Sequence, residues 1–304
     1  MNGIINVYKE KGFTSFDVVA KLRGILKQKK IGHTGTLDPD AVGVLPVCLG
    51  SATRLCDLLT DKKKEYVAEF VLGKETDTQD ITGTVLKEQD VNCTQEEVAS
   101  AIQSFVGDYE QLPPMYSALK VDGKRLYELA RQGKEVERKK RPVTFYEIEI
   151  LNMELPRVTI RVLCSKGTYI RTLCHDIGQK LGCGAAMTAL ERTQSGQFTK
   201  DHAYTLSEIE QIRDRGELDG IIMPVDTVFA DLPELIVKDE IKKKVLNGNL
   251  ISINECKKAG ITDCFSDGKK IRVYKDDNNS CNFIATYQYS NAKKGMVPDK
   301  MFLG

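Results

Sequence analysis

The sequence lacks the long apolar stretches that membrane insertion and export require. No run approaches the ~20 consecutive apolar residues of a membrane-spanning helix. The N-terminus, Met1–Ile5, has no basic segment followed by an apolar one, so we expect no secretory signal peptide. The nine cysteines form no Cys-x-x-Cys pair, and we expect them to be reduced thiols. These absences favour a cytoplasmic protein.

Motifs for common cofactors are also missing. The chain has no Gly-x-Gly-x-x-Gly dinucleotide motif, no Walker A loop and no His-Glu-x-x-His zinc motif. It contains only three histidines, and its cysteines are dispersed, which argues against zinc. Asp38 with Asp40, and Asp77 with Asp80, could attract a metal ion, but neither pair has the spacing of a known metal loop. We therefore expect neither a metal nor another cofactor.

A strong net charge is absent as well, because 44 basic residues balance 43 acidic residues and leave a formal net charge of +1. Global charge therefore does not indicate a nucleic-acid partner. The basic residues are clustered instead, at 27–30, 62–64 and 134–141. Each cluster fits a solvated face of a helix or loop. The first directly precedes the segment around Asp38 and the second precedes a predicted strand, which favours a polyanion running past that segment.

The most informative stretch that is present runs from Gly32 to Pro46 and carries Asp38. Pro39 disfavours helical backbone for the residue before it, so we expect Asp38 in an extended or turn conformation. The glycines of this stretch allow backbone geometries and close approaches that side chains would block. A carboxylate presented in this way suits chemistry on a ligand. On this evidence alone Asp40 is as eligible as Asp38.

The spacing of apolar residues predicts helices and strands without strict β-α-β alternation, which is typical of an α+β fold. We expect a helix that begins at an N-cap on Ser15 and ends near Lys27. The capping-box spacing of Thr94 and Glu97 predicts a second helix. Further elements are expected as strands at 66–72, 143–151 and 158–164, and as a helix over 170–181 that ends at Gly182.

The pattern of predicted elements changes after about Val228. A short helix is expected at 238–246, and short strands at 250–253, 270–274 and 282–287. This is the pattern of a small, mostly β module. A length of 304 residues fits one large and one small domain, so we expect domains at 1–228 and 229–304.

Three further side chains could act together with Asp38. Arg171 stands at a predicted strand-to-helix junction, where it could pair with a buried carboxylate and favour the charged form, although an arginine facing water is the simpler interpretation. Tyr66 opens a strand directly after a lysine run, and its default interpretation is a core or edge aromatic. His33 alone is more typical of a structural hydrogen-bonding residue than of a catalyst.

Together these segments resemble the TruB family, the bacterial tRNA pseudouridine-55 synthases. Gly32–Pro39, followed by Gly43–Pro46, closely resembles the catalytic motif of that family. The resemblance covers about residues 3–228 and continues in blocks at Lys64–Gly83, Pro114–Gly133, Cys164–Arg171 and Leu181–Thr193. One departure is visible, because the early Lys-Pro-x-Gly of the family reads Lys9-Glu10-Lys11-Gly12 here.

The resemblance implies a fold and a set of partners. The fold is a mixed, mostly antiparallel central sheet flanked by helices, with a small C-terminal β-barrel-like RNA-binding domain of the PUA type. The block at Pro114–Gly133 resembles the stand-alone bacterial enzymes rather than their guide-RNA-dependent relatives. We therefore expect a monomer that binds the T-arm of tRNA without a guide RNA and contacts the acceptor end through its C-terminal domain.

The implied reaction is the isomerisation of uridine to pseudouridine at position 55 in the T-loop, without a cofactor. The N1–C1′ bond breaks, the base rotates, and C5 joins C1′. By resemblance Asp38 is the essential carboxylate, acting as a nucleophile or stabilising a sugar-centred cation. Arg171 would hold Asp38 ionised and oriented. Because the target uridine must be flipped out of a folded loop, Tyr66 would stack on the flipped base.

The resemblance also implies contacts with the substrate. Tyr169 and Leu190 would line the pocket, and His33 would support the opened RNA loop. Lys9 and Lys62–Lys64 would contact phosphates, and Lys166 is a further substrate-binding candidate.

Three other functions stay open at this stage. One is a non-catalytic RNA-binding or RNA-folding protein on the same scaffold. Another is a synthase that acts on a different RNA or needs a guide. The third is a metal-dependent nuclease using Asp38, Asp40 and Asp77, which the ligand spacing does not support.

Overall fold

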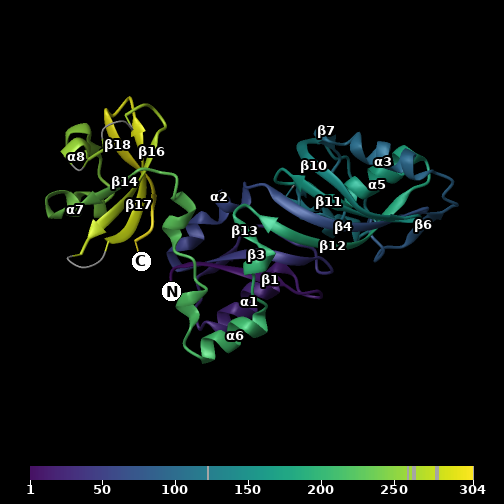
Figure 1. Cartoon of the computed structure of the whole chain (residues 1–304), viewed down its shortest axis with the longest axis horizontal. Helices are drawn as coiled ribbons and strands as arrows, with labels where there is room; N and C mark the ends of the chain where they lie inside the picture. The colour runs from purple at the N-terminus through teal and green to yellow at the C-terminus, as the bar shows by residue number, and fades with distance from the viewer. Residues whose placement is uncertain (122, 259, 262–264, 278–280, 304) are drawn as a thin grey trace.

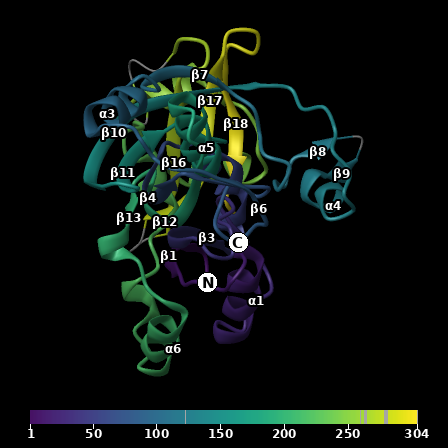
Figure 2. The ribbon, with the colours of Figure 1, turned by 90° about the vertical axis from the view of Figure 1, so that its right-hand side faces the viewer.

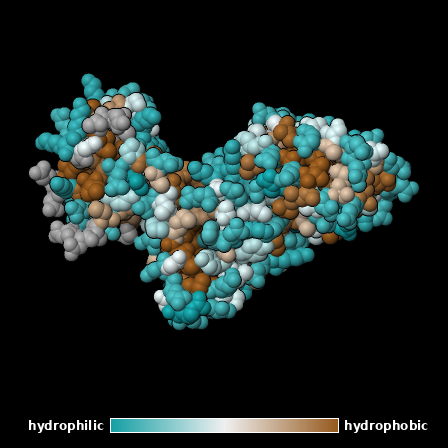
Figure 3. Space-filling view, viewed as in Figure 1, coloured by the Kyte–Doolittle hydropathy of each residue, from teal (hydrophilic) through white to brown (hydrophobic). Residues whose placement is uncertain are grey.

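The computed structural model describes residues 1–303 except 122, 259, 262–264 and 278–280. It forms two lobes, a larger one built on a nine-stranded sheet and a smaller C-terminal one built on a five-stranded sheet (Figure 1). The space-filling view shows a broad notch between the two lobes (Figure 3). No helix in the described part of the chain is long and apolar enough to cross a membrane.

The large sheet consists of β1 (Gly3–Lys9), β2 (Ile31–His33), β3 (Val42–Leu49), β4 (Lys64–Leu72), β7 (Gly107–Gln111), β10 (Arg141–Glu154), β11 (Arg157–Cys164), β12 (Ala185–Ser195) and β13 (Phe198–Thr199). Its order is β1-β3-β12-β4-β11-β10-β7, with β2 beside β3 and β13 beside β12. Among these described strands only β12 and β3 pair in parallel. The expected α+β class with a mixed, mostly antiparallel sheet is therefore confirmed.

Helices cover this sheet in two groups. The helical segments are α1 (Ser15–Ile25), η1 (Gly50–Leu55), α2 (Cys56–Thr60), α3 (Gln95–Gln103), α5 (Ile170–Leu181), η2 (Lys200–His202), α6 (Leu206–Asp214), η3 (Leu218–Gly220) and η4 (Val225–Phe229). Helices α3 and α5 pack on β4, β10, β11 and β12 around a core that contains Phe70 and Phe145. Helices α1 and α6 lie side by side against β1 and β3 (Figure 1).

The ends of α1 and α5 show how local sequence sets the elements near the site. The expected N-cap on Ser15 is wrong by one residue, because Thr14 accepts the hydrogen bond from the backbone of Asp17 and forms a capping box with it. Helix α1 also ends at Ile25, before Lys27. Helix α5 ends as predicted at Gly182, which adopts φ 74°.

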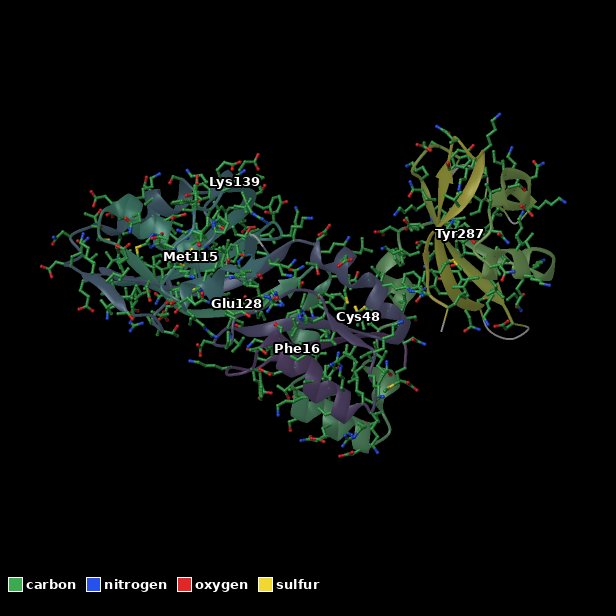
Figure 4. All side chains as sticks on the ribbon, turned by 180° about the vertical axis from the view of Figure 1, so that it is seen from behind. Phe16, Cys48, Met115, Glu128, Lys139 and Tyr287 are labelled. Atoms are coloured by element: carbon green, nitrogen blue, oxygen red, sulfur yellow. The ribbon has the colours of Figure 1, made fainter. Side chains whose placement is uncertain are left out.

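Two short hairpins extend from the large sheet. One consists of β5 (Lys74–Thr76) and β6 (Val85–Glu88), and the other of β8 (Lys120–Val121) and β9 (Lys124–Arg125), followed by α4 (Leu126–Ala130). The second hairpin and α4 project to one side of the body, which we call the projecting arm (Figure 2). Seen from behind, Glu128 of the projecting arm and the flanking Met115 and Lys139 lie in front of the large lobe (Figure 4).

The C-terminal lobe consists of β14 (Glu234–Val237), α7 (Asp239–Leu246), β15 (Ile251–Ser252), α8 (Ile253–Lys258), β16 (Lys270–Asp276), β17 (Cys281–Ser290) and β18 (Gly295–Met301). Its sheet has the order β14-β16-β17-β18-β15 and its own core, which includes Tyr287 (Figure 4). The sequence did not predict β14 or β18, and the expected strand at 250–253 is shorter because α8 begins at Ile253.

Aromatic rings join this lobe to the end of the large one. Phe283 of β17 lies 5.2 Å from Phe302 between ring centroids, and Phe302 lies 5.9 Å from Phe229 of η4. Such contacts favour a fixed junction between the lobes.

Candidate active site

Asp38 lies in the loop between β2 and β3, and buried groups hold the backbone of this loop on both sides of the carboxylate. Ser15 Oγ accepts from Leu37 N at 2.9 Å. The Pro39 carbonyl accepts from Gly12 N at 2.9 Å and from Lys9 Nζ at 3.1 Å. The loop is therefore fixed immediately before and after Asp38. The side chain of Asp38 remains 44% exposed, so a ligand can reach it.

Arg171 joins three separate segments at this carboxylate. Its Nε lies 3.0 Å from Asp38 Oδ2, its Nη1 donates to the Thr78 carbonyl at 3.1 Å, and its Nη2 donates to the Tyr116 carbonyl at 2.9 Å. Nη1 also lies 3.4 Å from Asp80 Oδ2. Only 7% of the Arg171 side chain is exposed, so this is not the water-facing arginine that its position at a helix start suggests. The expected Asp38–Arg171 ion pair is present.

The electrostatics of the pair differ in one respect from expectation. Burial raises the pKa of Asp38 above its ordinary value, and the positive charge of Arg171 opposes that rise without cancelling it. The charge of Asp80 raises the pKa of Asp38 further. Arg171 therefore limits the cost of burying the Asp38 carboxylate, while the environment as a whole makes Asp38 ionise less readily than a carboxylate in water.

Apolar and aromatic groups lie beside the pair. Tyr66 on β4 and Leu190 on β12 are both buried in the same core cluster as Leu37, next to Asp38. Tyr169 is the N-cap of α5, where Gln111 accepts from its amide at 2.8 Å and donates to its carbonyl at 3.0 Å. Burial raises the pKa of both tyrosines. The structure thus brings Tyr66, Tyr169 and Leu190 to the region of Asp38 and Arg171.

His33 stands at the end of β2, at the start of the same loop. Its Nδ1 lies 3.2 Å from the Gly35 carbonyl, and burial lowers the pKa of the imidazole. A neutral ring bonded to its own loop agrees with a structural or space-filling part.

Two of the lysines predicted to contact phosphates are buried, which corrects the interpretation of both. Lys9 is fully buried, and its Nζ donates to the carbonyls of Glu10, Phe13 and Pro39. Lys64 Nζ donates to the carbonyls of Thr60 and Lys62 at 2.7 and 2.8 Å. Burial lowers the pKa of each to about 8. Both ammonium groups support backbone around the site and do not face solvent.

The other predicted lysines are accessible. Lys62 and Lys63 are exposed, and Lys63 Nζ lies 3.7 Å from the centroid of the Tyr146 ring. Lys166 is exposed and pairs with Asp61 at 2.8 Å. These three cations lie where an RNA backbone could meet them without rearrangement of the core.

Two residues of the site were missed by sequence reasoning. From the sequence Asp80 is considered only as a possible metal ligand, yet its second carboxylate oxygen faces Arg171, and its first accepts from Thr78 and Thr82. Arg192 is the other, a fully buried cation behind the Asp38 loop. Asp40, in contrast, is an exposed loop residue 4.0 Å from Lys11. Within the described residues no group of three or more histidine, cysteine or acidic side chains could hold a metal ion.

Comparisons with known proteins place this fold. The chain is similar to solved structures described as a Cbf5-Nop10-Gar1 complex, with a TM-score of 0.72 and 30% identity over 99% of this chain and 85% of that chain. A structure described as the archaeal box H/ACA sRNP Nop10-Cbf5 complex matches with a TM-score of 0.70 and 28% identity, over 99% and 86% of the two chains.

Family models identify the class as the pseudouridylate synthases. Residues 23–170 match the N-terminal domain of the TruB family of pseudouridylate synthases, and residues 171–230 match the C-terminal domain of tRNA pseudouridylate synthase B. The protein belongs to the TruB family. It is 52% identical to the tRNA pseudouridine synthase B of Lachnoclostridium phytofermentans over 100% of both chains. It is 48% identical to that of Clostridium kluyveri, over 91% of this chain and 93% of the other.

Proposed function

We propose that this protein isomerises uridine 55 in the T-loop of tRNA to pseudouridine, without a guide RNA or a cofactor. The observation that carries the proposal is the accessible Asp38 carboxylate paired with the buried Arg171 guanidinium at 3.0 Å. Relatives at 52% and 48% identity named tRNA pseudouridine synthase B support tRNA as the substrate. The projecting arm belongs to the block that resembles the stand-alone bacterial enzymes, which supports independence from a guide RNA.

The reaction needs one carboxylate and a way to present the base to it. Flipping the uridine out of the T-loop costs on the order of a few kcal/mol of unstacking. Asp38 then acts as the nucleophile, or stabilises the sugar-centred cation, while the N1–C1′ bond breaks. The uracil rotates, and C5 joins C1′ as any bond to Asp38 breaks. The C5 proton is then lost to solvent and N1 takes up a proton, so the product is an isomer of the uridine. Because no electrons enter or leave overall, the isomerisation needs no oxidant or reductant.

The side chains around Asp38 bind and position the RNA in ways that agree with where the structure places them. Tyr66 stacks on the flipped uracil, a contact worth about 1–3 kcal/mol for an aromatic ring and a base. Tyr169 and Leu190 complete the wall of the pocket, and His33 supports the opened T-loop. Lys62, Lys63 and Lys166 contact phosphates, because these are the exposed cations of the set. Lys9 and Lys64 act indirectly, through the backbone they hold.

The C-terminal part, residues 229–304, has a separate place in the proposal. Its five-stranded sheet with its own core supports an independent RNA-binding module of the PUA type. We assign it to the acceptor end of the tRNA. The enzyme acts as a cytoplasmic monomer.

The test is to incubate the purified protein with a T-arm transcript as the only RNA and to map pseudouridine, with and without a chelator. We expect conversion at position 55 in both samples. A transcript with cytidine at that position is the matched control. Conversion only after a second RNA is added would indicate a guide-dependent enzyme. Binding without conversion would indicate an RNA-binding protein, and chelator-sensitive cleavage would indicate a nuclease.

A further inference from the structure

Arg192 is the largest of the fully buried side chains, and the reaction as proposed gives it no part. No carboxylate of the described chain pairs with its guanidinium, whose assigned acceptors are two backbone carbonyls. Burying a cation without a counter-ion is costly unless its donors are used. A residue kept in this state therefore calls for a specific use of its donors.

The two backbone carbonyls that accept hydrogen bonds from Arg192 belong to residues before and after Asp38 in the chain. Arg192 Nε donates to the Val44 carbonyl at 2.7 Å, and Nη1 donates to the Thr36 carbonyl at 3.5 Å. The backbones of β12 and β3 also approach each other closely here, because a Cβ added to Gly43 would lie 2.2 Å from the Arg192 carbonyl oxygen. Arg192 therefore holds the two ends of the Asp38 loop at once.

The same residue stands directly beside Tyr66. Arg192 is paired with Tyr66 across the antiparallel strands β12 and β4, and with Gly43 across β3. Paired residues of antiparallel strands project their side chains to one face, with Cβ atoms about 4.5–5.5 Å apart. The positive charge of Arg192 and the closeness of its side chain to the Tyr66 hydroxyl both oppose the rise that burial causes in the pKa of Tyr66.

One donor group of Arg192 is left over. Nη2 is buried and has no hydrogen-bond acceptor among the described residues. It lies too deep for a phosphate to reach. A buried, unused guanidinium nitrogen beside an aromatic hydroxyl is suited to a bond that forms when that ring moves.

We propose that Arg192 is a positioning residue that couples the Asp38 loop to Tyr66, holding the loop through the carbonyls of Thr36 and Val44 and donating Nη2 to the Tyr66 hydroxyl when uracil stacks on the ring. This inference rests on the proposed function. In this inference one buried side chain holds the Asp38 carboxylate and the stacked base in fixed positions relative to each other. Because only 1% of Arg192 is exposed, it acts on turnover and leaves RNA affinity unchanged.

The test is a double-mutant cycle with Arg192→Lys and Tyr66→Phe on the full-length protein. Lysine keeps the charge and much of the stem but cannot bond three groups in the fork geometry of arginine. Phenylalanine keeps the stacking ring and removes the hydroxyl. Single-turnover rate and Kd are measured on the T-arm transcript, and thermal unfolding reports folding.

For Arg192→Lys we expect a rate about tenfold or more lower, the range of one hydrogen bond to a charged group, with Kd within about twofold. In the Tyr66→Phe background the same substitution should lower the rate much less, because the hydroxyl that accepts from Arg192 is already absent. Equal factors in the two backgrounds, or a loss confined to Kd, would overturn the inference.

A second measurement keeps the test decisive if Arg192→Lys does not fold. The wild-type protein bound to a T-arm RNA should show Arg192 Nη2 within about 3.2 Å of the Tyr66 hydroxyl, and a separation beyond hydrogen-bonding distance would reject the inference. A wild-type protein that forms no pseudouridine refutes the proposed function. If the wild type is active but Arg192→Lys lowers the rate by the same factor with and without the Tyr66 hydroxyl, only the role of Arg192 is refuted.

Discussion

Replacing Arg171 by methionine is the perturbation that the structure specifies most fully. Methionine keeps the length and apolar character of the stem but removes the guanidinium. The change leaves the Asp38 carboxylate without its partner at 3.0 Å and frees the carbonyls of Thr78 and Tyr116, which the same guanidinium bonds. Three segments of the site thereby lose their common anchor.

The expected loss follows from burial. Removing one partner of a buried ion pair costs about 3–5 kcal/mol. Because the Asp38 side chain is 44% exposed, water can replace part of the interaction, and we take the lower end, about 3 kcal/mol. Because the reaction uses this same ion pair, we take about 3 kcal/mol as the loss of transition-state stabilisation as well; at 1.36 kcal/mol for each factor of ten, the single-turnover rate should fall about 100-fold or more.

The pH dependence of the single-turnover rate should also change in Arg171→Met. Activity needs the ionised Asp38 and is lost as pH falls through the pKa of that carboxyl. Without Arg171, burial and the charge of Asp80 still raise the pKa of Asp38, and the smaller influence of Lys9 alone opposes them. The acid limb of the rate profile should therefore move to higher pH.

The assay is release of tritium from RNA labelled at uracil C5, since that hydrogen leaves when the new C–C bond forms. Arg157→Met is the matched control, because Arg157 is 62% exposed and its pair with Glu69 is a surface ion pair of little energetic value. An Arg171→Met protein that is folded, retains its rate within tenfold and keeps the same acid limb would refute the reasoning.

Three other outcomes follow from the geometry. Asp80→Asn should move the acid limb to lower pH, opposite to Arg171→Met, because the Asp80 charge raises the pKa of Asp38; a shift in the same direction for both variants would contradict this arrangement. Burial lowers the pKa of Lys9 to about 8, so between about pH 8 and 10 the unfolded chain holds a proton that the folded chain lacks. Over this range the unfolding free energy of the wild type should rise with pH relative to Lys9→Met in urea titrations, and a constant difference would argue against the burial. If Lys62 and Lys63 contact phosphates, RNA affinity should fall steeply with salt, and removing each lysine should reduce the logarithmic slope by about one; an unchanged slope would exclude the contact.

Three strands of the large sheet, β4, β10 and β11, were predicted from their apolar residues, whereas β1 and β3 were missed because they are buried almost throughout and do not alternate. The pattern at 66–72 gave β4, and the same alternation also shows why Lys64 was misjudged. Lys64 stands two residues before Tyr66, so it shares the inward face of the strand and is buried with it. Counting that parity would have separated Lys64 from the exposed Lys63, whereas Lys62 has the same parity but lies before the strand begins.

Other parts of the site are invisible to local sequence. Asp80 meets Arg171 only because the segment after β5 folds back beside α5, and nothing in the spacing of Asp77 and Asp80 predicts that contact. The burial of Arg192 depends on its register with both Tyr66 and Gly43. The Asp38–Arg171 pair was expected through family resemblance, since no periodicity links residues so far apart. The strands β14 and β18 were missed because β14 is only four residues long and Pro298 interrupts the pattern of β18.

The most direct measurement compares Asp38→Asn with Asp40→Asn for pseudouridine formation on the T-arm transcript. Both variants remove one negative charge from the same loop, but Asp38 faces Arg171 while Asp40 is exposed beside Lys11. We predict that Asp38→Asn binds the transcript and forms no pseudouridine, whereas Asp40→Asn turns over at close to the wild-type rate. Near-normal turnover by Asp38→Asn would contradict the assignment of Asp38 as the catalytic carboxylate.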